Sequence, residues 1–309
     1  MNIVKELWRL RYGGVRFRLM DIACSGYLAF VGLLLLFFHK AVSHWPVYAV
    51  AHFVLALIVL EFVRFAERKP RNFSLRFLRT FYPIGIFLIA WSTVNAVVRM
   101  FFGTFWFTEP AILMDKFLFG THPTVWIQQH YNPWLDELMN FFYATYYLFL
   151  PGVSLLLYFK GKKKEAVATF SFLSVALFSN YLLFYLLPTL SPAMAEGVRE
   201  LHTQNNSGYF FSWAVRTIQS GAGVAGGAFP SSHIAEIFVL SLAAWRYMRK
   251  LGYFLLPLTL GVSISTVYLR YHHAVDPIFG YFLGGICFVL TLRILKRRGE
   301  DPMAQKSDS

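Results

Sequence analysis

The sequence predicts an all-α protein that crosses a membrane several times, and three observations support this fold class. Of its 309 residues, 57% are hydrophobic and only 15% are charged, whereas soluble domains are about half apolar and about a quarter charged. The apolar residues form runs long enough to cross a bilayer, which takes about 20 residues. Short basic blocks separate the runs. Because a lipid-exposed backbone must satisfy its own hydrogen bonds, we expect these runs to be helices.

Eight apolar runs are candidate transmembrane helices. The first run is long enough to span and no small-residue cleavage site follows it, so we expect it to remain as an anchor. We divide the chain into an N-terminal segment with two additional helices (1–79), a six-helix core (80–295) and a hydrophilic tail (296–309) that we expect to be disordered. The eight runs lie at residues 20–38, 46–63, 80–102, 138–159, 166–188, 233–249, 252–270 and 276–294.

Basic residues between the runs predict the orientation of the chain. Most of the 29 Lys and Arg residues lie before the first run, after the second, fourth and sixth, and after the eighth. In an eight-helix arrangement these blocks share one side, and the positive-inside rule places that side in the cytoplasm. We therefore expect both termini in the cytoplasm, in a bacterial inner or plasma membrane or a Golgi-type membrane of a eukaryote. This distribution also explains the net charge of +13 without nucleic-acid binding.

Two long loops are expected on the non-cytoplasmic face. Residues 102–137 contain several Trp and Tyr residues, which favour the headgroup layer. They predict one or two short helices in the interface that could cover a site, or alternatively a plain connector with aromatic anchors. Residues 188–230 form the second loop, which ends in a segment rich in Gly and Ala.

The stretch between the seventh and eighth runs carries an ionisable cluster. Residues 265–285 read STVYLRYHHAVDPIFGYFLGG, with His272, His273 and Asp276 at the junction and Arg270 just before them. Ionisable residues beside membrane-length apolar runs indicate a functional site. The spacing between His272 and Asp276 allows the carboxylate to hold one imidazole nitrogen, which leaves the other free to attack or to accept a proton. The alternative is a pair of interfacial histidines beside an aspartate that caps the eighth helix.

A second polar cluster stands at the start of the sixth run. Residues 228–236 read AFPSSHIAE. Pro230 is a helix-start signal, and Ser231 or Ser232 can cap the helix. The free amides and positive dipole of a helix start favour an anion, so this cluster, with His233 in the first turn, predicts a phosphate-binding site. The alternative is an ordinary helix cap beside a buried histidine.

The expected topology brings the two clusters together. The sixth run begins, the seventh ends and the eighth begins on the same, non-cytoplasmic side. His233 and the pair of His272 and Asp276 are therefore expected at one membrane depth, where they can converge. Two histidines, one held by an aspartate, beside an anion-binding helix start suit phosphoryl transfer. One histidine can attack phosphorus while the other protonates the leaving oxygen.

These two motifs resemble those of a known family. PSSH at 230–233 and HHAVD at 272–276 resemble the second and third motifs of the type 2 phosphatidic acid phosphatase superfamily, Pro-Ser-Gly-His (often Pro-Ser-Ser-His) and Ser-Arg-x5-His-x3-Asp. The stretch STVYLRYHHAVD is most similar to the branch that contains inositol phosphorylceramide synthases, in which Tyr-Leu precedes a His-His pair. The resemblance is specific across 186–285, extends as a pattern of spans across 80–185, and does not cover the first two runs.

The resemblance implies a role for each residue of the two motifs. His272 would be the nucleophile that forms a phosphohistidine, Asp276 would orient it, and His233 would be the general acid. Ser231, Ser232 and nearby amides would hold the phosphate. The family normally needs no metal or other cofactor.

Two departures from the family motifs concern the phosphate ligands. The arginine of the third motif falls at Thr266, so Arg270, Arg199 or Arg216 would replace it, and Arg270 is the nearest in the sequence. The first motif, Lys-x6-Arg-Pro, is not recognisable, and PTLSPA at 188–193 occupies its place without a basic residue. These departures affect the identity of the phosphate clamp more than the histidine chemistry.

The sequence therefore predicts an integral-membrane lipid phosphatase or phosphotransferase with its site on the non-cytoplasmic face. The substrate would be a lipid phosphate or phosphodiester, and the acceptor would be water or an alcohol. The alternatives are a lipid transporter or flippase, and an inactive relative that serves as a scaffold. A di-metal membrane oxidase would need several histidine clusters, whereas this chain has one pair and scattered single histidines.

Overall fold

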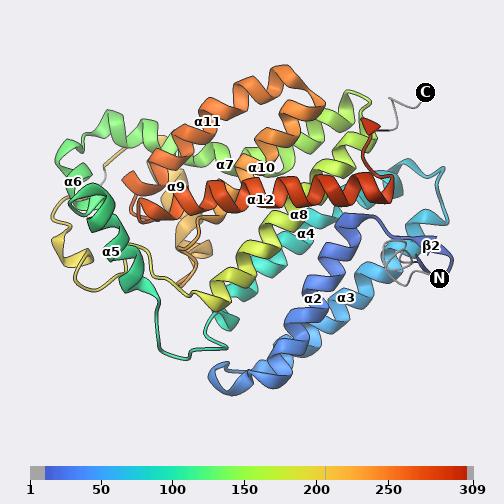
Figure 1. The fold of residues 1–309 in the computed structure, drawn as a ribbon, viewed down its shortest axis with the longest axis horizontal. Helices are drawn as coiled ribbons and strands as arrows, with labels where there is room; N and C mark the ends of the chain where they lie inside the picture. Colours follow the sequence, from blue (N-terminus) through green and yellow to red (C-terminus); the bar gives the residue numbers. More distant parts are fainter. Residues whose placement is uncertain (1–10, 206, 305–309) are drawn as a thin grey trace.

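The computed structural model describes residues 11–205 and 207–304 and confirms the predicted fold class (Figure 1). The chain is an all-α bundle, and its described strands are limited to a short hairpin of β1 (Arg11–Tyr12) and β2 (Val15–Arg16). Within these ranges, seven helices are long and apolar enough to cross a membrane. They are α2 (Leu19–Phe37), α3 (Trp45–Glu67), α4 (Phe73–Val97), α7 (Pro133–Phe159), α8 (Lys163–Leu186), α11 (Arg249–Tyr268) and α12 (Val275–Arg298).

The sixth expected span is present as a shorter helix, α10 (Ser232–Tyr247), so seven rather than eight helices have membrane length in the described chain. Its 16 residues cover about 24 Å, less than the roughly 30 Å of a hydrocarbon core. The preceding segment is not helical, and Thr189 exchanges backbone hydrogen bonds with Gly226 and Ala228 in it. Because α10 packs against α7, α8, α11 and α12, protein rather than lipid surrounds this irregular backbone, where it is tolerated.

Helix α8 lies at the centre of the bundle. It packs against α2, α4, α7, α10 and α12, and its buried residues lie on all sides of the helix. The side chains of Phe170, Phe172 and Phe184 are fully buried. A helix that is apolar all round belongs in the interior, and here it is the element that the other helices surround.

The two N-terminal helices dock on the bundle through a buried ion pair. Arg79 of α4 donates two hydrogen bonds to Asp21 of α2, at 2.8 and 2.5 Å, and Tyr82 donates a third at 2.7 Å. Asp21 is completely buried and Arg79 nearly so. Farther along α2, the hydroxyls of Tyr27 and Tyr185 lie 2.6 Å apart. Buried charges need such partners, because an unpaired one is costly, so these contacts determine how α2 sits on α4 and α8.

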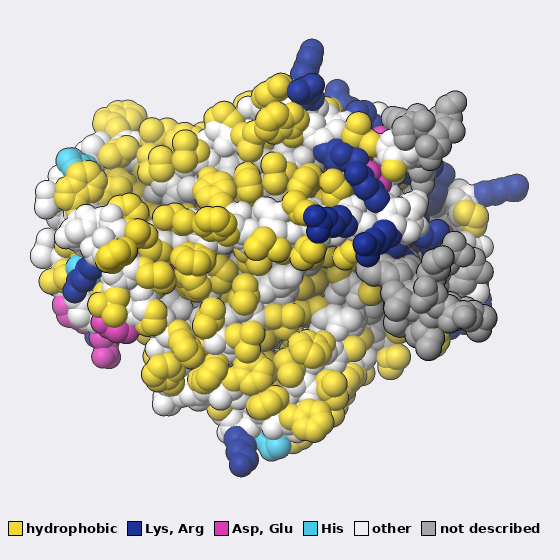
Figure 2. Space-filling model, in the orientation of Figure 1, with side chains coloured by type: hydrophobic (Ala, Val, Ile, Leu, Met, Phe, Trp, Pro, Cys, Tyr) yellow, Lys and Arg dark blue, Asp and Glu magenta, His cyan; other side chains and the backbone are white. Residues whose placement is uncertain are grey.

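The basic blocks meet at one end of the bundle, as the eight-helix arrangement requires. Lys and Arg side chains gather at the end where both termini lie, and a broad apolar surface covers the middle of the molecule (Figures 1 and 2). Which side of a membrane this end faces remains a prediction. The contacts that join the blocks are Arg18 with Glu67, Lys162 with the Tyr247 carbonyl, Arg246 with Asp301, and Arg16 with the Arg298 carbonyl.

The hydrophilic tail is packed rather than disordered up to Ala304, so our expectation is wrong for that part; residues 305–309 lie outside the described residues. Helix α12 continues to Arg298, which donates to the Phe17 carbonyl at 2.5 Å. Glu300 accepts from the Leu19 amide at 2.9 Å, and Asp301 is buried. The charges that predicted disorder instead pair with the N-terminal segment.

The long loops occupy the opposite end (Figure 1). Residues 102–137 form α5 (Thr108–Phe119) and α6 (Pro123–Ile127), which confirms the expectation of short helices there. The second loop contains α9 (Phe210–Ala222), a helix that we did not predict. The remaining turns of 3-10 helix are η1 (His39–Ala41), η2 (Gln128–His130) and η3 (Arg199–Leu201).

Candidate active site

Two glycines let the two sequence motifs approach each other. A Cβ atom at Gly280 of α12 would lie 2.7 Å from the Ser231 carbonyl oxygen, and one at Gly284 would lie 2.8 Å from that of Ala235. Small residues at such a spacing allow helix backbones to pack closely. The Ser231 amide also donates to the carbonyl of Asp276 at 3.0 Å. The start of α10 is therefore joined directly to the start of α12.

His272 is held by a backbone carbonyl as well as by the predicted aspartate. Its Nδ1 lies 2.7 Å from the Ala228 carbonyl oxygen and 3.3 Å from Oδ2 of Asp276. A carbonyl oxygen only accepts, so Nδ1 carries the proton, and the neutral ring has an unprotonated Nε2. Burial lowers the pKa of His272 to about 4, although the bond to Ala228 opposes this shift. The imidazole is therefore neutral near pH 7, as a nucleophile must be.

The two motif histidines are in contact. Nδ1 of His233 lies 3.2 Å from Nε2 of His272. Because that Nε2 can only accept, Nδ1 of His233 is the donor, and its own Nε2 accepts from the Tyr143 hydroxyl at 2.8 Å. Gln219 of α9 in turn donates to Tyr143 at 2.5 Å. The hydrogen bonds thus all point the same way, from the Gln219 amide to the Ala228 carbonyl. This order places the proton of each histidine on Nδ1.

Asp276 does more than hold His272. Its Oδ2 accepts from the His273 amide at 2.7 Å. The N-cap residue of α12 is Ala274, so Asp276 lies in the first turn and is not the helix cap of the alternative interpretation. Its Oδ1 is buried without a hydrogen-bond partner. The carboxylate therefore shapes the turn before α12 and also lies beside the His272 ring.

His273, by contrast, contacts the second long loop and helix α5. Its Nε2 lies 3.1 Å from the Leu190 carbonyl, and its Nδ1 lies 3.8 Å from Asp115 of α5. Asp115 also accepts from the amides of Ala274 and Val275, at 3.0 and 2.9 Å. The sequence did not predict this role for Asp115, because its partners are about 160 residues away. Of the two adjacent histidines, His272 contacts His233, whereas His273 contacts the Leu190 carbonyl and Asp115.

The two serines lie where a phosphate could be bound. Ser231 and Ser232 are buried at the start of α10, and the Ser231 hydroxyl has no hydrogen-bond partner among the described residues. As the N-cap residue, Ser231 makes no side-chain cap bond, so its hydroxyl and the first-turn amides can turn to an anion. The role of both serines as phosphate ligands remains a prediction.

Arg270 does not lie with the histidines in this structure. Its guanidinium donates to the Tyr131 hydroxyl at 3.1 Å and to the Gln204 carbonyl, and it lies over the Tyr131 ring. Its backbone has a positive φ of 64°, which is uncommon outside glycine. Arg199 is paired with Glu200 at the surface. The basic phosphate ligand that the motifs predict is therefore not supplied by either arginine in the arrangement seen.

A buried acid lies one helical turn beyond His233. Glu236 accepts from the Tyr146 hydroxyl at 2.7 Å, and its second oxygen has no partner. The Tyr146 ring packs against the His233 ring, with centroids 4.4 Å apart. Glu236 is part of the motif AFPSSHIAE, but the sequence did not predict that its side chain would be buried beside Tyr146. In the part of the chain that the structure describes, no group of three His, Cys, Asp or Glu side chains could hold a metal ion.

Near the starts of α10 and α12, two histidines thus lie in contact, and one of them is held by a carbonyl and an aspartate. The chain belongs to the PAP2 superfamily, whose family description matches residues 112–290. It is also 35% identical over 102 residues to a PA-phosphatase related-family protein of Dictyostelium discoideum. That match covers 32% of this chain and only 18% of the relative. No solved structure matches. Family and fold together support a phosphatase-type function in the membrane.

Proposed function

We propose that the protein is a lipid phosphatase or phosphotransferase that forms a phosphohistidine on His272. The observation that carries this proposal is the forced tautomer of His272, whose unprotonated Nε2 faces the Nδ1 proton of His233 at 3.2 Å. The proposed nucleophile and the proposed proton donor are thus adjacent, and Nε2 of His272 has a free lone pair for attack once the contact with His233 opens. The six-helix core at 80–295 would contain the whole site, and the family match lies within it.

In the first step, the Nε2 lone pair of His272 would attack phosphorus of a lipid phosphate or phosphodiester. The bond from phosphorus to the leaving oxygen breaks, and that oxygen takes the Nδ1 proton of His233. For the charges to balance, His233 must first be protonated on both nitrogens, by the monoanion of a lipid phosphate or, for a phosphodiester, by solvent. The phosphorylated His272 ring gains positive charge, which the Ala228 carbonyl and the Asp276 carboxylate would stabilise.

In the second step, His233 would remove a proton from the acceptor, whose oxygen attacks phosphorus as the bond to His272 breaks. Water as acceptor gives a phosphatase, and an alcohol gives a phosphotransferase. The His-His pair after Tyr-Leu in STVYLRYHHAVD resembles inositol phosphorylceramide synthases and favours the transferase. We propose Ser231, Ser232 and the first-turn amides of α10 as the phosphate ligands, with Arg270 able to contribute only after it leaves Tyr131.

The test is an assay of the full chain in mild detergent with lipid phosphates and phosphodiesters, in the presence of EDTA. Inorganic phosphate and lipid products are followed together, with and without an alcohol acceptor such as inositol. Free phosphate from the wild type but not from His272→Ala supports the phosphatase. A new lipid that appears only with the alcohol supports the transferase. His39→Ala is the matched control, because His39 of η1 contacts the Leu36 carbonyl and the Trp45 ring and no residue of the proposed site among those described.

Three results would contradict parts of the proposal. Activity that EDTA abolishes would exclude a metal-independent mechanism. Full activity in His272→Ala would exclude this residue as the nucleophile. An unchanged lipid pool with altered sidedness in vesicles would instead favour the transporter or flippase.

We also propose that the site faces the non-cytoplasmic side and that both termini are cytoplasmic. Cys24 and Cys287, the two native cysteines, are both buried. Labelling of a cysteine introduced at exposed Ser220 of α9 therefore shows on which side of the membrane α9 lies. A membrane-impermeant maleimide added to intact cells is expected to label Ser220→Cys. Labelling only after the cells are opened would reverse the orientation.

A further inference from the structure

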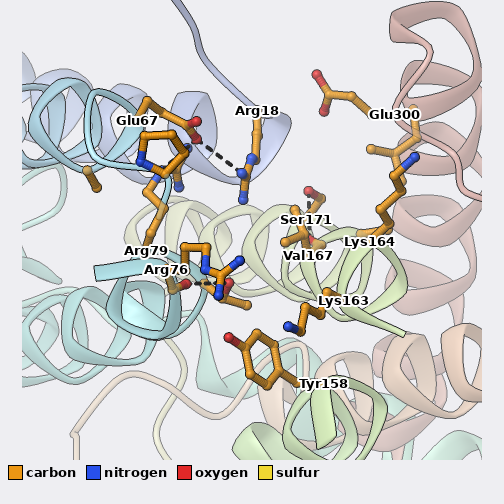
Figure 3. A pocket seen from close by; sticks show the side chains of 15 residues that line it. Arg18, Glu67, Arg76, Arg79, Tyr158, Lys163, Lys164, Val167, Ser171 and Glu300 are labelled. Atoms are coloured by element: carbon orange, nitrogen blue, oxygen red, sulfur yellow. Dashed lines mark hydrogen bonds and ion pairs between the residues drawn. The ribbon is translucent and has the colours of Figure 1, made fainter. Parts of the chain in front are cut away.

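A cavity of about 420 Å³ opens at the basic end of the bundle (Figure 3). Figure 3 shows Arg76 and Arg79 from α4 on one side and Lys163 from α8 on the other, with Arg18 above them and Lys164 on the side of Glu300. The floor includes apolar side chains, among them Val167, Ala168 and Leu295. The lining comes from α3, α4, α7, α8 and α12 and from Arg18 before α2, so segments from both halves of the chain enclose one cationic space.

This cavity is separate from the histidine site. Helix α12 carries Asp276 in its first turn and Leu295, which lines the cavity, near its last. A helical segment of that length covers about 28 Å. The proposed phosphoryl transfer therefore does not use any residue of the cavity.

Positive charge in the cavity exceeds what its carboxylates can neutralise. Two carboxylates, Glu67 and Glu300, line it together with five basic side chains. Glu67 already contacts Arg18 at 3.0 Å and Arg79 at 3.3 Å. Glu300 accepts from Arg298 at 2.8 Å as well as from a backbone amide. Both acids are therefore engaged within the protein.

Two basic side chains of the cavity lack a carboxylate partner among the described residues. Neither Arg76 nor Lys163 takes part in an ion pair there; Lys163 lies 5.3 Å over the ring of Tyr158. Lys163 is also the first residue of α8, whose N-cap Lys162 makes no side-chain cap bond. The amides of this helix start thus add to the positive potential.

An independent observation points to a ligand. Tyr158 is 4% exposed and lines the cavity, yet its hydroxyl is buried and has no hydrogen-bond partner in the described structure. Buried hydroxyls are nearly always satisfied, so an unsatisfied one needs an explanation. In Figure 3 the ring of Tyr158 lies beside Lys163 at the rim of the cationic space. A phosphate oxygen could accept from this hydroxyl and from the cations around it.

We propose that this cavity binds a phosphate ester anion, with Arg76, Lys163 and the Tyr158 hydroxyl as its ligands. The same chemistry is available from the headgroup of an anionic lipid and from a soluble phosphate. Because the cavity lies at the ends of membrane-length helices, it is at the level where lipid headgroups are expected. A bound anion would join α4, α7 and α8 and so stabilise the bundle.

The experiment measures the thermal unfolding temperature of the full chain in a neutral detergent. The probes are dioctanoyl phosphatidylglycerol, dioctanoyl phosphatidylcholine and inorganic phosphate, each titrated separately. We expect phosphatidylglycerol to raise the unfolding temperature and the zwitterionic lipid to do so at least tenfold less strongly. A comparable rise with inorganic phosphate would identify a soluble phosphate as the source, and a rise with phosphatidylglycerol alone would identify a lipid headgroup.

Matched variants locate the effect. Arg76→Ala with Lys163→Ala should weaken the apparent affinity at least tenfold. Arg293→Ala with Lys296→Ala removes the same charge from exposed positions of α12 and should leave the affinity unchanged. If the first pair does not fold, Tyr158→Phe removes only the hydroxyl and should weaken binding several-fold. Equal shifts in the cavity and control variants, or no shift of the wild type with any probe, would overturn the proposal.

Discussion

The two ends of the bundle use polar groups in opposite ways. At the histidine end, the side chains of Gln219, Tyr143, His233 and His272 form a chain in which each donor meets an acceptor, and the chain ends at the Ala228 carbonyl. At the basic end, cations outnumber carboxylates around an open cavity. Such a chain determines the protonation state of each histidine nitrogen without any ligand. A nitrogen that receives a hydrogen bond must be unprotonated, and one that faces a carbonyl must carry the proton. Unpaired positive charge must instead be neutralised by a bound anion or solvated by water.

The largest expected effect separates the two adjacent histidines. His272→Gln removes the Nε2 nucleophile, so turnover should fall by at least about 10³-fold. His273→Gln should mainly lower stability, because His273 contacts the Leu190 carbonyl and Asp115. The measurement is turnover per folded molecule, with unfolding temperature recorded for both. A greater loss of turnover in His273→Gln would transfer the nucleophile assignment to that residue.

The next effect tests the buried ion pair between Arg79 and Asp21 at the basic end. Arg79→Leu leaves Asp21 buried and unpaired, which should cost about 3–5 kcal/mol of unfolding free energy. The double variant Asp21→Leu with Arg79→Leu removes both charges and should recover most of that loss. Denaturant unfolding in detergent measures both variants. If the double variant were no more stable than Arg79→Leu, the cost would come from lost packing and not from the unpaired charge.

A third effect tests how closely α10 and α12 must approach. Gly280→Ala places a Cβ 2.7 Å from the Ser231 carbonyl oxygen, so backbone has to move at the phosphate site. We expect a destabilisation of about 1–3 kcal/mol and a loss of turnover larger than the loss of folded protein. Gly285→Ala is the control, since a Cβ there would lie 3.9 Å from a Phe238 ring atom and would meet nothing closer among the described residues. Equal behaviour of the two variants would show that the close approach is not required.

The smallest effect concerns the hydrogen bond behind His233. Tyr143→Phe removes the donor to Nε2, a contact worth about 0.5–1.5 kcal/mol. Turnover should fall about two- to tenfold with little change in KM, and the pH profile should shift because the tautomer of His233 is less strongly set. Tyr147→Phe keeps the contact between Tyr143 and His233 and should have a smaller effect. An unchanged pH profile in Tyr143→Phe would make Tyr143 a packing residue only.

Several parts of the site were predictable from the sequence, and others were not. The approach of His233 to His272 followed from counting spans, because the two motifs fall at helix ends on one side. The contact of Asp276 with His272 followed from their spacing along the chain. The Ala228 carbonyl is closer to Nδ1 than Asp276 is, and no residue pattern predicts a backbone acceptor 44 positions away. Arg270 was chosen for proximity in sequence, but its backbone directs it toward Tyr131.

By itself, the sequence determined the helical fold class, the limits of most helices, the grouping of basic blocks and the two motifs that carry the histidines. These features depend on hydrophobicity over a window of residues and on local spacing. The tertiary structure alone decided the tautomers of both histidines, the role of Asp115, the short α10 and the cationic cavity. The physical reason is that each depends on how helices rotate and cross, and that is decided by side-chain packing between segments far apart in the chain.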